Sequence, residues 1–329
     1  MDIELTGRLQ GAKKAKWQVF LSRAGLEADE QVESTVLVWD EGEIIATGSR
    51  MGNLLKCIAV DEFRQGEGLT ATLLTQLRQD AFSHGHSHLF LYTKPKNEFM
   101  FSSLFFYPIA KTDTVLLMEN KRGGIAEFLK TLPDGETGGT NGAAVMNCNP
   151  FTRGHRYLIE TAAKECDRLY VFVLSEDKSE FSAADRMEMV KRGTADLSNV
   201  TVLPTGPYLI SSATFPTYFL KDRESAEQVH CLLDIEVFSK YYAPKFGITR
   251  RYVGTEPLSQ MTNQYNDALK AHLPGKGIAL REIPRLEQDA TPISASAVRA
   301  ALAQKDIATL EKLLPETSAR YLQEQLSMY

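Results

Sequence analysis

A short group of residues near the middle of the chain has the make-up of a phosphate-binding turn. Thr152, Gly154 and His155 follow an apolar run at 143–146 and the turn pair Asn149-Pro150. The apolar positions after them recur at helical spacing, so these residues would open a helix. The first turn of a helix presents unpaired N–H groups and a positive dipole end, which favour phosphate. Gly154 would let a ligand approach without an intervening side chain, and His155 would add a ring N–H donor.

A second group of the same kind lies about 140 residues further along the chain. Ser294 and Ser296 can cap a helix and donate to phosphate oxygens, and Arg299 brings a planar fork of donors one turn later. Either group alone would be an ordinary capped helix. Together, in a chain whose strands and helices alternate, they indicate a nucleoside triphosphate site.

These two groups carry a resemblance to a known superfamily. The first is the T-x-G-H version of an H-x-G-H signature, and 293–299 (I-S-A-S-A-V-R) is similar to the I-S-S/A-T/S-x-x-R signature that accompanies it. The segments thus resemble the nucleotidyltransferases, which attack the α-phosphate of a nucleoside triphosphate and release pyrophosphate. The resemblance implies catalytic roles for Thr152, His155 and Arg299. It implies nucleotide-binding roles for Gly154, Ser294 and Ser296.

The same superfamily holds ATP at the carboxyl ends of parallel strands, where the strand order reverses. Two expected strand ends would line that pocket: Asn147 and Cys148 after the first, and Gly254, Thr255 and Glu256 after a later one. Each could equally be a loop residue without a ligand contact. Arg186 and Lys221 are looser candidates for the polyphosphate, and a salt-bridged surface role fits them as well.

The first third of the chain holds another glycine-bearing loop. Strands expected at 35–39, 43–47 and 54–60 lead into Gln65-Gly66-Glu67-Gly68-Leu69-Thr70 and a helix. A strand, a glycine loop and a helix form a nest of N–H groups that can hold a pyrophosphate. The loop resembles the Q/R-x-x-G-x-G/A loop with which Gcn5-related N-acetyltransferases grip coenzyme A, which implies that Gln65, Gly66 and Gly68 contact a pyrophosphate. Thr70 departs from that pattern, and a plain glycine turn is the alternative.

The order of these elements predicts an α/β protein with two domains. A chain of 329 residues is longer than one hydrophobic core usually serves. We expect an acetyltransferase-like domain at 1–130 and a Gly- and Thr-rich linker at 131–142. Residues 143–329 should form a nucleotidyltransferase domain with a doubly wound, Rossmann-like parallel sheet.

Composition narrows the classes of partner. A net charge of −5 argues against a nucleic-acid partner, and the short basic clusters at 13–16 and 250–251 are expected to be solvated faces. The cysteines at 57, 148, 166 and 231 show no C-x-x-C spacing, so we expect neither zinc nor a disulfide framework. The histidines at 84, 86 and 88 fit a solvated helix end better than a metal site. Because no apolar run approaches the length of a membrane span, we expect a soluble cytoplasmic protein.

Nearly the entire chain is similar to the citrate lyase ligase family. The segments that carry this resemblance are 145–159 (V-M-N-C-N-P-F-T-R-G-H-R-Y-L-I), 213–219 (A-T-F-P-T-Y-F), 254–257 (G-T-E-P) and 292–299 (P-I-S-A-S-A-V-R). The resemblance implies that ATP, bound with Mg²⁺, and acetate form acetyl-AMP and pyrophosphate. It also implies that the acetyl group passes to the thiol of the phosphoribosyl-dephospho-coenzyme A arm on the acyl carrier subunit of citrate lyase.

Three other interpretations compete with this one. The same chemistry could serve malonate decarboxylase, which carries a similar arm. An adenylyltransferase of the phosphopantetheine or nicotinamide mononucleotide type would not need the extra N-terminal domain. A module that merely senses nucleotide and acyl-coenzyme A could dispense with His155 and Arg299, and both are present.

Overall fold

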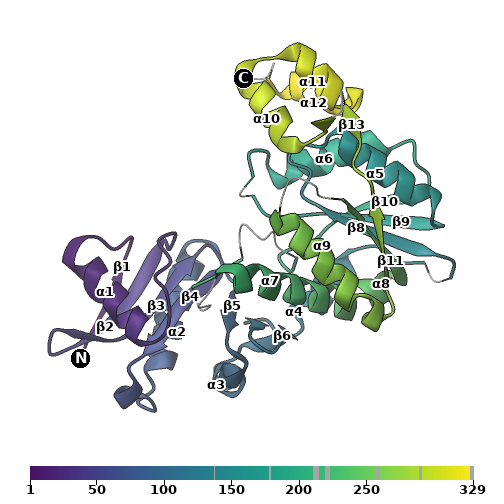
Figure 1. Ribbon diagram of the computed structural model, residues 1–329. Coiled ribbons are helices and arrows are strands. Elements are labelled where there is room, and N and C mark those ends of the chain that lie inside the picture. Colours follow the sequence, from purple (N-terminus) through teal and green to yellow (C-terminus); the bar gives the residue numbers. More distant parts are fainter. Residues whose placement is uncertain are drawn as a thin grey trace. The chain divides into compact units, whose positions relative to one another are not determined.

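The computed structural model consists of two compact α/β units, and the chain passes between them more than once (Figure 1). It describes residues 1–136, 138–177, 179–209, 215–218, 223–255, 260–288 and 291–326. The first unit comprises Met1–Gly124 and Pro216–Leu233, and the second comprises Ile125–Phe215 and Asp234–Tyr329.

The first unit is built on a seven-stranded sheet in the order β1-β2-β3-β4-β5-β7-β6. Its strands are β1 (Asp2–Thr6), β2 (Ser34–Asp40), β3 (Glu43–Met51), β4 (Leu54–Val60), β5 (Phe90–Thr93), β6 (Tyr107–Lys111) and β7 (Leu116–Glu119), and its helices include α1 (Gly11–Arg23), α2 (Leu69–Ser83) and α3 (Glu98–Ser103). Neighbouring strands are antiparallel, except that β4 and β5 run parallel and pair at Leu54↔Phe90 and Leu55↔Leu91. The predicted order of three strands, a glycine loop and a helix is therefore confirmed.

The second unit is built on a five-stranded sheet in which every strand is parallel to its neighbours. The order is β10-β9-β8-β11-β12, from β8 (Asn141–Met146), β9 (Arg168–Val173), β10 (Val200–Pro204), β11 (Ile248–Gly254) and β12 (Ala279–Ile283). The chain starts in the middle at β8, moves outward through β9 and β10, and then returns to place β11 on the other side of β8. This arrangement confirms the predicted doubly wound sheet, whose strand order reverses between β8 and β11.

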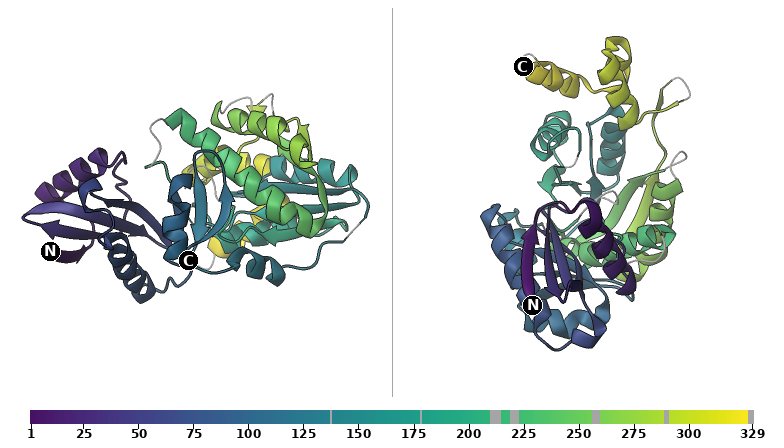
Figure 2. Two further views of the ribbon diagram at one scale, coloured as in Figure 1. Left: turned by 90° about the horizontal axis from the view of Figure 1, so that it is seen from below. Right: turned by 90° about the vertical axis from the view of Figure 1, so that its left-hand side faces the viewer.

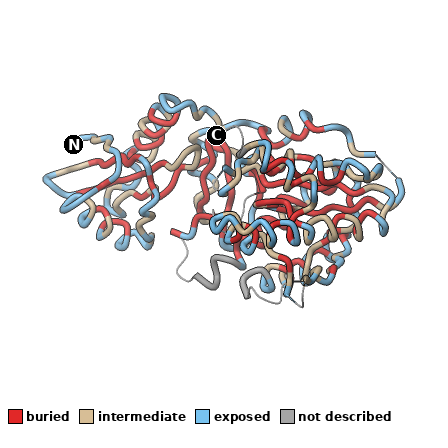
Figure 3. The backbone as a smooth tube through the Cα atoms, turned by 90° about the horizontal axis from the view of Figure 1, so that it is seen from above, coloured by how far each residue is buried: buried red, intermediate tan, exposed pale blue. Residues whose placement is uncertain are grey.

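Helices cover both faces of this parallel sheet. One face packs against α5 (Arg153–Lys164) and α6 (Ala183–Thr194), through residues such as Ile159 and Met189. On the other face Phe172 receives the ring edges of Phe238, Tyr242 and Phe246 at 6.4, 5.4 and 5.4 Å between centroids. Alternation along β9 explains the two cores, because odd and even positions point to opposite faces. Buried residues are red in Figure 3.

The remaining helices of the second unit frame the sheet. They are α4 (Gly124–Thr131), the C-terminal end of α7 (Arg223–Val237), α8 (Ala243–Phe246), α9 (Gln260–His272), α10 (Ala295–Gln304), α11 (Ile307–Leu313) and α12 (Glu316–Leu326). The last three, yellow in Figures 1 and 2, gather at one end of this unit.

The division between the units differs from the predicted domain limits. Helix α4 was expected in the first domain, but its Phe128 packs against Tyr208 of the second unit, with ring centroids 5.7 Å apart. The described part of 131–142 is also packed, because Asp134 pairs with Lys245 at 2.5 Å. A Cβ on Gly135 would lie 2.4 Å from the Cα of Phe246. The described part of this segment therefore packs on the second unit and leads into β8, and it differs from the open linker that we expected.

The basic pair at 250–251 is not a solvated face as a whole, because Arg250 is partly exposed and Arg251 is buried. Strand alternation sends the two side chains to opposite faces of β11, and helices cover the face that Arg251 occupies. Arg251 is 1% exposed, and its Nη2 donates to Asp234 Oδ2 at 3.1 Å and to the Tyr265 hydroxyl at 2.7 Å. Its guanidinium also lies 4.5 Å from the ring centroid of Phe238. A carboxylate and an aromatic face thus offset the cost of burying the charge.

The tight contact between α6 and the turn before α5 yields a stability prediction. A Cβ on Gly193 would lie 2.3 Å from Cε1 of Phe151, which is fully buried. Overpacking of this kind costs about 1–3 kcal/mol, which outweighs the helix propensity of about 1 kcal/mol that alanine adds. Gly193→Ala should lower the urea midpoint, and Gly275→Ala, where open space surrounds the new Cβ, should not. Equal midpoints for the two variants would contradict the packing argument.

Candidate functional site

The candidate site forms where the carboxyl ends of β8 and β11 lie side by side in the sheet. Strand β8 runs through the turn at 147–152 into α5, and β11 ends at Gly254. In an open parallel sheet, ligands bind at such a reversal point because the chain leaves the two strands in opposite directions. The structure therefore brings the T-x-G-H group and the G-T pair to one edge, as the sequence predicts.

The N-terminus of α5 is closed by a reciprocal pair of hydrogen bonds between Thr152 and His155. The backbone N–H of His155 donates to Thr152 Oγ1 at 3.3 Å, and the backbone N–H of Thr152 donates to His155 Nδ1 at 3.1 Å. Since Nδ1 accepts a backbone proton, the ring proton must sit on Nε2 in the neutral imidazole. His155 can thus present an Nε2–H donor in a fixed orientation.

The surroundings of His155 keep its ring neutral. The ring stacks on Phe151, with centroids 6.0 Å apart and an angle of 17° between planes. Desolvation by the surrounding protein, followed by the positive charge of Arg285, lowers the pKa of His155 to about 4. The side chain therefore serves as a neutral hydrogen-bond donor near pH 7, and other residues must supply positive charge.

The second signature meets the first at Gly154. A Cβ on Gly154 would lie 3.4 Å from the Ile293 carbonyl oxygen and 3.6 Å from Ile293 Cβ. These are ordinary van der Waals distances, so the first turn of α5 lies directly beside the residue just before Ser294. Arg299 completes the junction, because its Nη1 donates to the Asn149 carbonyl at 2.6 Å. Gly154 thus lies at the contact between the two motifs, and its predicted role in ligand approach stays a prediction.

Ser294, Ser296 and Arg299 lie at the start of α10. Ser294 is the N-cap, and its Oγ accepts the backbone N–H of Ala297 at 3.1 Å. Ser296 is exposed, while Ser294 and Arg299 are partly exposed, so all three can be reached from solvent. Arg299 also faces Glu180, with 3.5 Å between Nε and Oε2. The segment offers a helix N-terminus, two hydroxyls and one cation beside α5.

The turn after β8 holds one exposed and one buried candidate. Asn147 is exposed, whereas the Cys148 side chain is 1% exposed and burial raises its pKa. Arg186 is fully buried, and its Nη1 donates to the Asn147 carbonyl at 2.9 Å and to Asn147 Oδ1 at 2.6 Å. Arg186 thus holds Asn147 in place, and its burial argues against the direct polyphosphate contact expected for it.

The end of β11 reveals a cation that the sequence reasoning missed. Thr255 Oγ1 accepts the backbone N–H of Arg285 at 3.2 Å, and the Thr255 carbonyl accepts Arg285 Nε at 2.9 Å. Asn266 Nδ2 donates to the Gly254 carbonyl at 2.9 Å. A positive side chain two residues beyond the end of β12 was the available signal for Arg285. Of the other candidates near this strand end and the polyphosphate, Glu256 and Lys221 lie outside the described residues.

The glycine loop of the first unit has the backbone that its sequence predicts. Gly66 and Gly68 have φ values of 90° and 78°, in the left-handed region that favours glycine. Gln65, Gly66 and Gly68 are exposed, and α2 begins directly after Gly68. The hydroxyl of Thr70 lies 3.9 Å from Met100 Sδ of α3, so it points toward that helix. The loop presents backbone N–H groups at the start of a 15-residue helix.

Two histidines of the first unit have protein partners. His84 Nδ1 lies 2.8 Å from the Asp80 carbonyl oxygen, and His88 Nε2 lies 2.7 Å from Glu119 Oε2. Among the described residues, no group of three or more His, Cys, Asp or Glu side chains is arranged to hold a metal ion. Within the same residues, no helix combines the length and apolarity that a membrane crossing needs.

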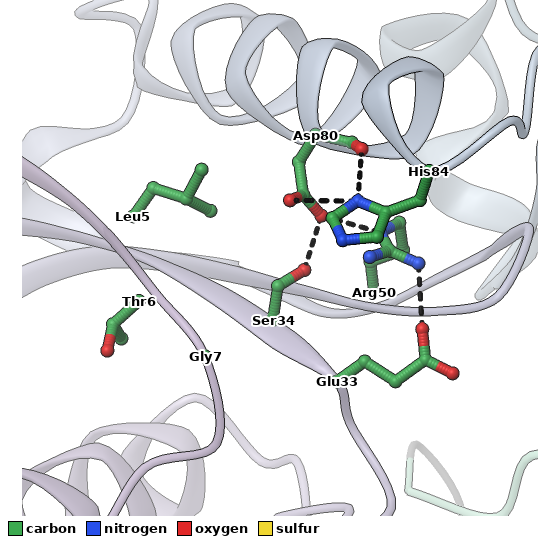
Figure 4. Close-up of a pocket in the computed structure, with 8 residues that line it drawn as sticks. All are labelled: Leu5, Thr6, Gly7, Glu33, Ser34, Arg50, Asp80 and His84. Carbon is green, nitrogen blue, oxygen red and sulfur yellow. Dashed lines mark hydrogen bonds and ion pairs between the residues drawn. The ribbon is translucent and has the colours of Figure 1, made fainter.

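The first unit also contains a pocket of about 510 Å³, which is lined by residues outside the predicted motifs (Figure 4). Arg50 lines this pocket. Its Nε donates to Asp80 Oδ2 at 2.6 Å, and its Nη1 donates to Glu33 Oε2 at 2.8 Å. The Ser34 hydroxyl also donates to Asp80 Oδ2, at 2.5 Å. The charge of Arg50 is therefore neutralised by the carboxylates of Asp80 and Glu33, which also line the pocket. None of the predicted site residues lines this pocket.

The second unit combines a doubly wound parallel sheet with a capped-helix anion site at the point where the strand order reverses. Together these features define a nucleotidyltransferase-type domain. Comparison with known proteins extends that class. The family model described as the citrate lyase ligase C-terminal domain matches residues 141–322. The chain belongs to the citrate lyase ligase family.

Three similar proteins cover different parts of the chain. The citrate (pro-3S)-lyase ligase of Escherichia coli (strain K12) is 39% identical over 326 residues, which are 97% of this chain and 93% of that protein. A phosphopantetheine adenylyltransferase of Clostridium botulinum (strain 657 / Type Ba4) is 40% identical over 79 residues, which are 23% of this chain and 44% of that protein. The crystal structure of an acyl-CoA N-acyltransferase from Pseudomonas aeruginosa superposes with a TM-score of 0.32 and 11% identity, covering 36% of this chain and 99% of that one.

The neutral, oriented ring of His155 predicts a large effect on nucleotide chemistry. His155→Ala should lower acetate-dependent ATP–pyrophosphate exchange by about 10²–10³-fold, the usual cost of losing one preorganised donor. Thermal stability should fall only modestly, because one hydrogen bond of the helix cap is lost. Since the pKa of the ring is lowered to about 4, protonation of His155 should not limit the wild-type rate from about pH 5 upward. His272→Ala, at an exposed histidine of the same unit, is the control. Exchange within a few fold of wild type would overturn the role.

Thr152 tests whether the cap orients the ring. Thr152→Val keeps the shape but loses the hydroxyl, so it should cost about 1 kcal/mol of stability and a larger factor in exchange rate. Thr152→Ser retains the hydroxyl and should keep most of both. Denaturant unfolding and ATP–pyrophosphate exchange on the two variants separate these effects. An unaltered exchange rate in the valine variant would reduce Thr152 to a helix cap.

Proposed function

We propose that this chain is an acid–thiol ligase that acetylates the thiol arm on the acyl carrier subunit of citrate lyase and so activates the lyase. ATP and acetate would give acetyl-AMP and pyrophosphate, and the acetyl group would then pass to the thiol with release of AMP. The junction of the two signatures at Gly154 and Ile293 carries this proposal, because it unites two helix N-termini at one strand end. Membership of the ligase family supplies the substrate class.

The first step asks for charge stabilisation and not for a general base. A carboxylic acid of pKa about 4–5 is already ionised at pH 7, so an acetate oxygen can attack the α-phosphorus directly. The bond from that phosphorus to the bridging oxygen breaks, and pyrophosphate leaves. His155 Nε2–H, the N–H groups that open α5 and the hydroxyls of Ser294 and Ser296 would bind the phosphate oxygens. Arg299 and Arg285 would supply positive charge.

Magnesium fits this donor set as a companion of ATP and not as a protein-held ion. The site offers mainly N–H and guanidinium donors, which bind phosphate oxygens, and its serine hydroxyls could add no more than single oxygen ligands to a cation. Mg²⁺ keeps water ligands and commonly binds through substrate phosphates. When bound with ATP it would offset charge on the phosphates.

The second step needs a thiol from outside this chain. Cys57, Cys148 and Cys231 are buried, and burial raises the pKa of Cys57 to about 12. The partner's arm carries a thiol of ordinary pKa, about 8.5, which attacks once deprotonated. The thiolate sulfur would attack the acetyl carbon, and the bond to the AMP oxygen would break. We place this reaction in the cytoplasm, where free thiols persist.

The first unit would serve as a holder for that arm. The arm is a dephospho-coenzyme A derivative, so it keeps a pyrophosphate that the exposed nest at Gly66 and Gly68 can bind. A bound arm would raise the effective concentration of the thiol at the acetyl-AMP. This division assigns adenylation to the second unit and capture of the acceptor to the first.

Separating the two half-reactions tests this division. Gly68→Glu adds a carboxylate beside the proposed pyrophosphate, so acetyl transfer to the carrier thiol should fall at least tenfold while acetate-dependent ATP–pyrophosphate exchange survives. Gly85→Glu is a matched control, because it places the same charge at a similar φ of 82° at the other end of α2. Citrate lyase and malonate decarboxylase carriers should be compared as acceptors. Equal loss of both half-reactions would mean that the loop supports folding, and unchanged transfer would mean that the arm binds elsewhere.

A further inference from the structure

A phenylalanine occupies the position at which the end of α3 favours glycine. Phe105 has a left-handed φ of 63°, just beyond the last turn of α3. Its backbone N–H donates to the Ser102 carbonyl at 3.2 Å, and the N–H of Phe106 donates to the Phe101 carbonyl at 3.0 Å. The rings of Phe101 and Phe106 meet edge to face, with centroids 6.4 Å apart. These contacts form a Schellman cap, whose left-handed residue is usually glycine because a Cβ is strained there.

The ring of Phe105 gains no burial in return for this strain. Its side chain is 66% exposed, and in the same short stretch Phe99 is 86% exposed and Met100 is 37% exposed. Because all three belong to one short helix and its cap, they form a single surface feature, the α3 patch. Exposed apolar side chains that gather in this way mark binding surfaces, and backbone strain also concentrates at functional positions.

The α3 patch lies beside the glycine loop of the first unit. Met100 Sδ is 3.9 Å from the hydroxyl of Thr70, which is in the first turn of α2, two residues after Gly68. The end of α3 is tied to the same helix, because Arg78 Nη2 donates to the Leu104 carbonyl at 2.6 Å. A molecule bound at the loop therefore has the patch next to it.

Positive charge borders the α3 patch. Residues 94–111 contain three lysines and one glutamate, in a chain whose net charge is −5. Glu98 pairs with Lys111 at 2.9 Å, whereas Lys94 and Lys96 form no ion pair with the described part of the chain. Lys96 is exposed, and Lys94 is partly exposed. The patch thus suits a partner surface that is both apolar and negatively charged.

The chemistry of the thiol arm identifies such a partner. In a phosphoribosyl-dephospho-coenzyme A arm, the free thiol ends the pantetheine side of the pyrophosphate. The nucleoside and the phosphoribosyl group lie on the other side, between the pyrophosphate and the carrier protein. With the pyrophosphate held at Gly66 and Gly68, only these two groups separate the carrier from the loop. The carrier surface at the root of the arm must then rest close to the loop, together with the phosphoribosyl phosphate.

We propose that the α3 patch is the docking surface for the acyl carrier subunit, and that it binds the carrier protein at the root of the arm. The inference rests on the proposed role of the first unit as holder of the arm. Phe99, Met100 and Phe105 pack on apolar side chains of the carrier, which buries them as a small anchor. Lys94 and Lys96 face the phosphoribosyl phosphate and steer the carrier to the patch.

Phe105→Gly separates docking from folding. Glycine fits the left-handed cap, so the urea midpoint should rise. The KM for the deacetylated acyl carrier subunit of citrate lyase should increase at least fivefold, with ATP–pyrophosphate exchange unchanged, because an aromatic anchor is lost. Lys96→Glu should raise the same KM, and added salt should shrink that increase. Phe82→Ala, at a 74% exposed residue near the other end of α2, is the control. A wild-type KM in the Phe105→Gly variant would overturn the docking surface.

Binding of free 3′-dephospho-coenzyme A, measured by calorimetry on the full chain, distinguishes the carrier from its arm. Phe105→Gly should bind this probe as tightly as wild type, and Gly68→Glu should bind it at least tenfold more weakly. Equal loss in both variants would mean that the patch contacts the arm itself, which overturns docking and leaves the holder role intact. Probe binding indifferent to Gly68→Glu, with the carrier KM still raised by Phe105→Gly, would overturn the holder role and support the docking surface.

Discussion

The contact between the first turn of α5 and the backbone of Ile293 is the constraint on which the candidate site depends. A Cβ built at position 154 would lie 3.4 Å from the Ile293 carbonyl oxygen, an ordinary van der Waals contact, so the two segments lie side by side. This approach sets the start of α10 beside the start of α5, so two positive helix ends share one edge of the sheet. Arg299 then reaches the Asn149 carbonyl across the junction at 2.6 Å.

The candidate site combines two permanently charged arginines with one neutral histidine. Arginine keeps its proton at any physiological pH, so Arg299 and Arg285 provide constant positive charge. His155 is held neutral by its surroundings and contributes direction through one ring N–H. Such a group binds an oxygen without adding to the repulsion among the cations. Arg186 has a third task, because it is buried and fixes Asn147 from behind.

The sequence was most informative where chemistry and backbone geometry coincide. The T-x-G-H and I-S-A-S-x-x-R groups predicted two helix starts, and both begin with the expected caps, Thr152 and Ser294. The alternation of strands and helices predicted the parallel sheet. Contacts between distant residues could not be read in the same way. The residues next to Arg251 in the sequence do not indicate that it will be buried and paired with Asp234. The residues next to Phe128 do not indicate that its ring will pack against Tyr208 and so place α4 in the second unit.

Segment composition also misled for a physical reason. Glycine and threonine in 131–142 suggested an open connection, yet Gly135 is small because the Phe246 backbone passes 2.4 Å from where its Cβ would be. A glycine that permits close packing and a glycine that permits flexibility look alike in a sequence. Arg285 was missed because it belongs to no signature, and its role follows from a strand end that only the sheet order defines.

The three crossings of the chain between units have a consequence for how this protein can be divided. The boundaries fall after residues 124, 215 and 233, and the last lies inside α7, whose Asp234 is bound to the buried Arg251. No single cut of the backbone can therefore release either unit intact, because the first would lack its returning segment and the second would lose a piece of its interior. Each unit is therefore formed by two separate stretches of the chain. Helix α7 contributes residues to both units, so unfolding of either unit removes part of a helix that the other uses.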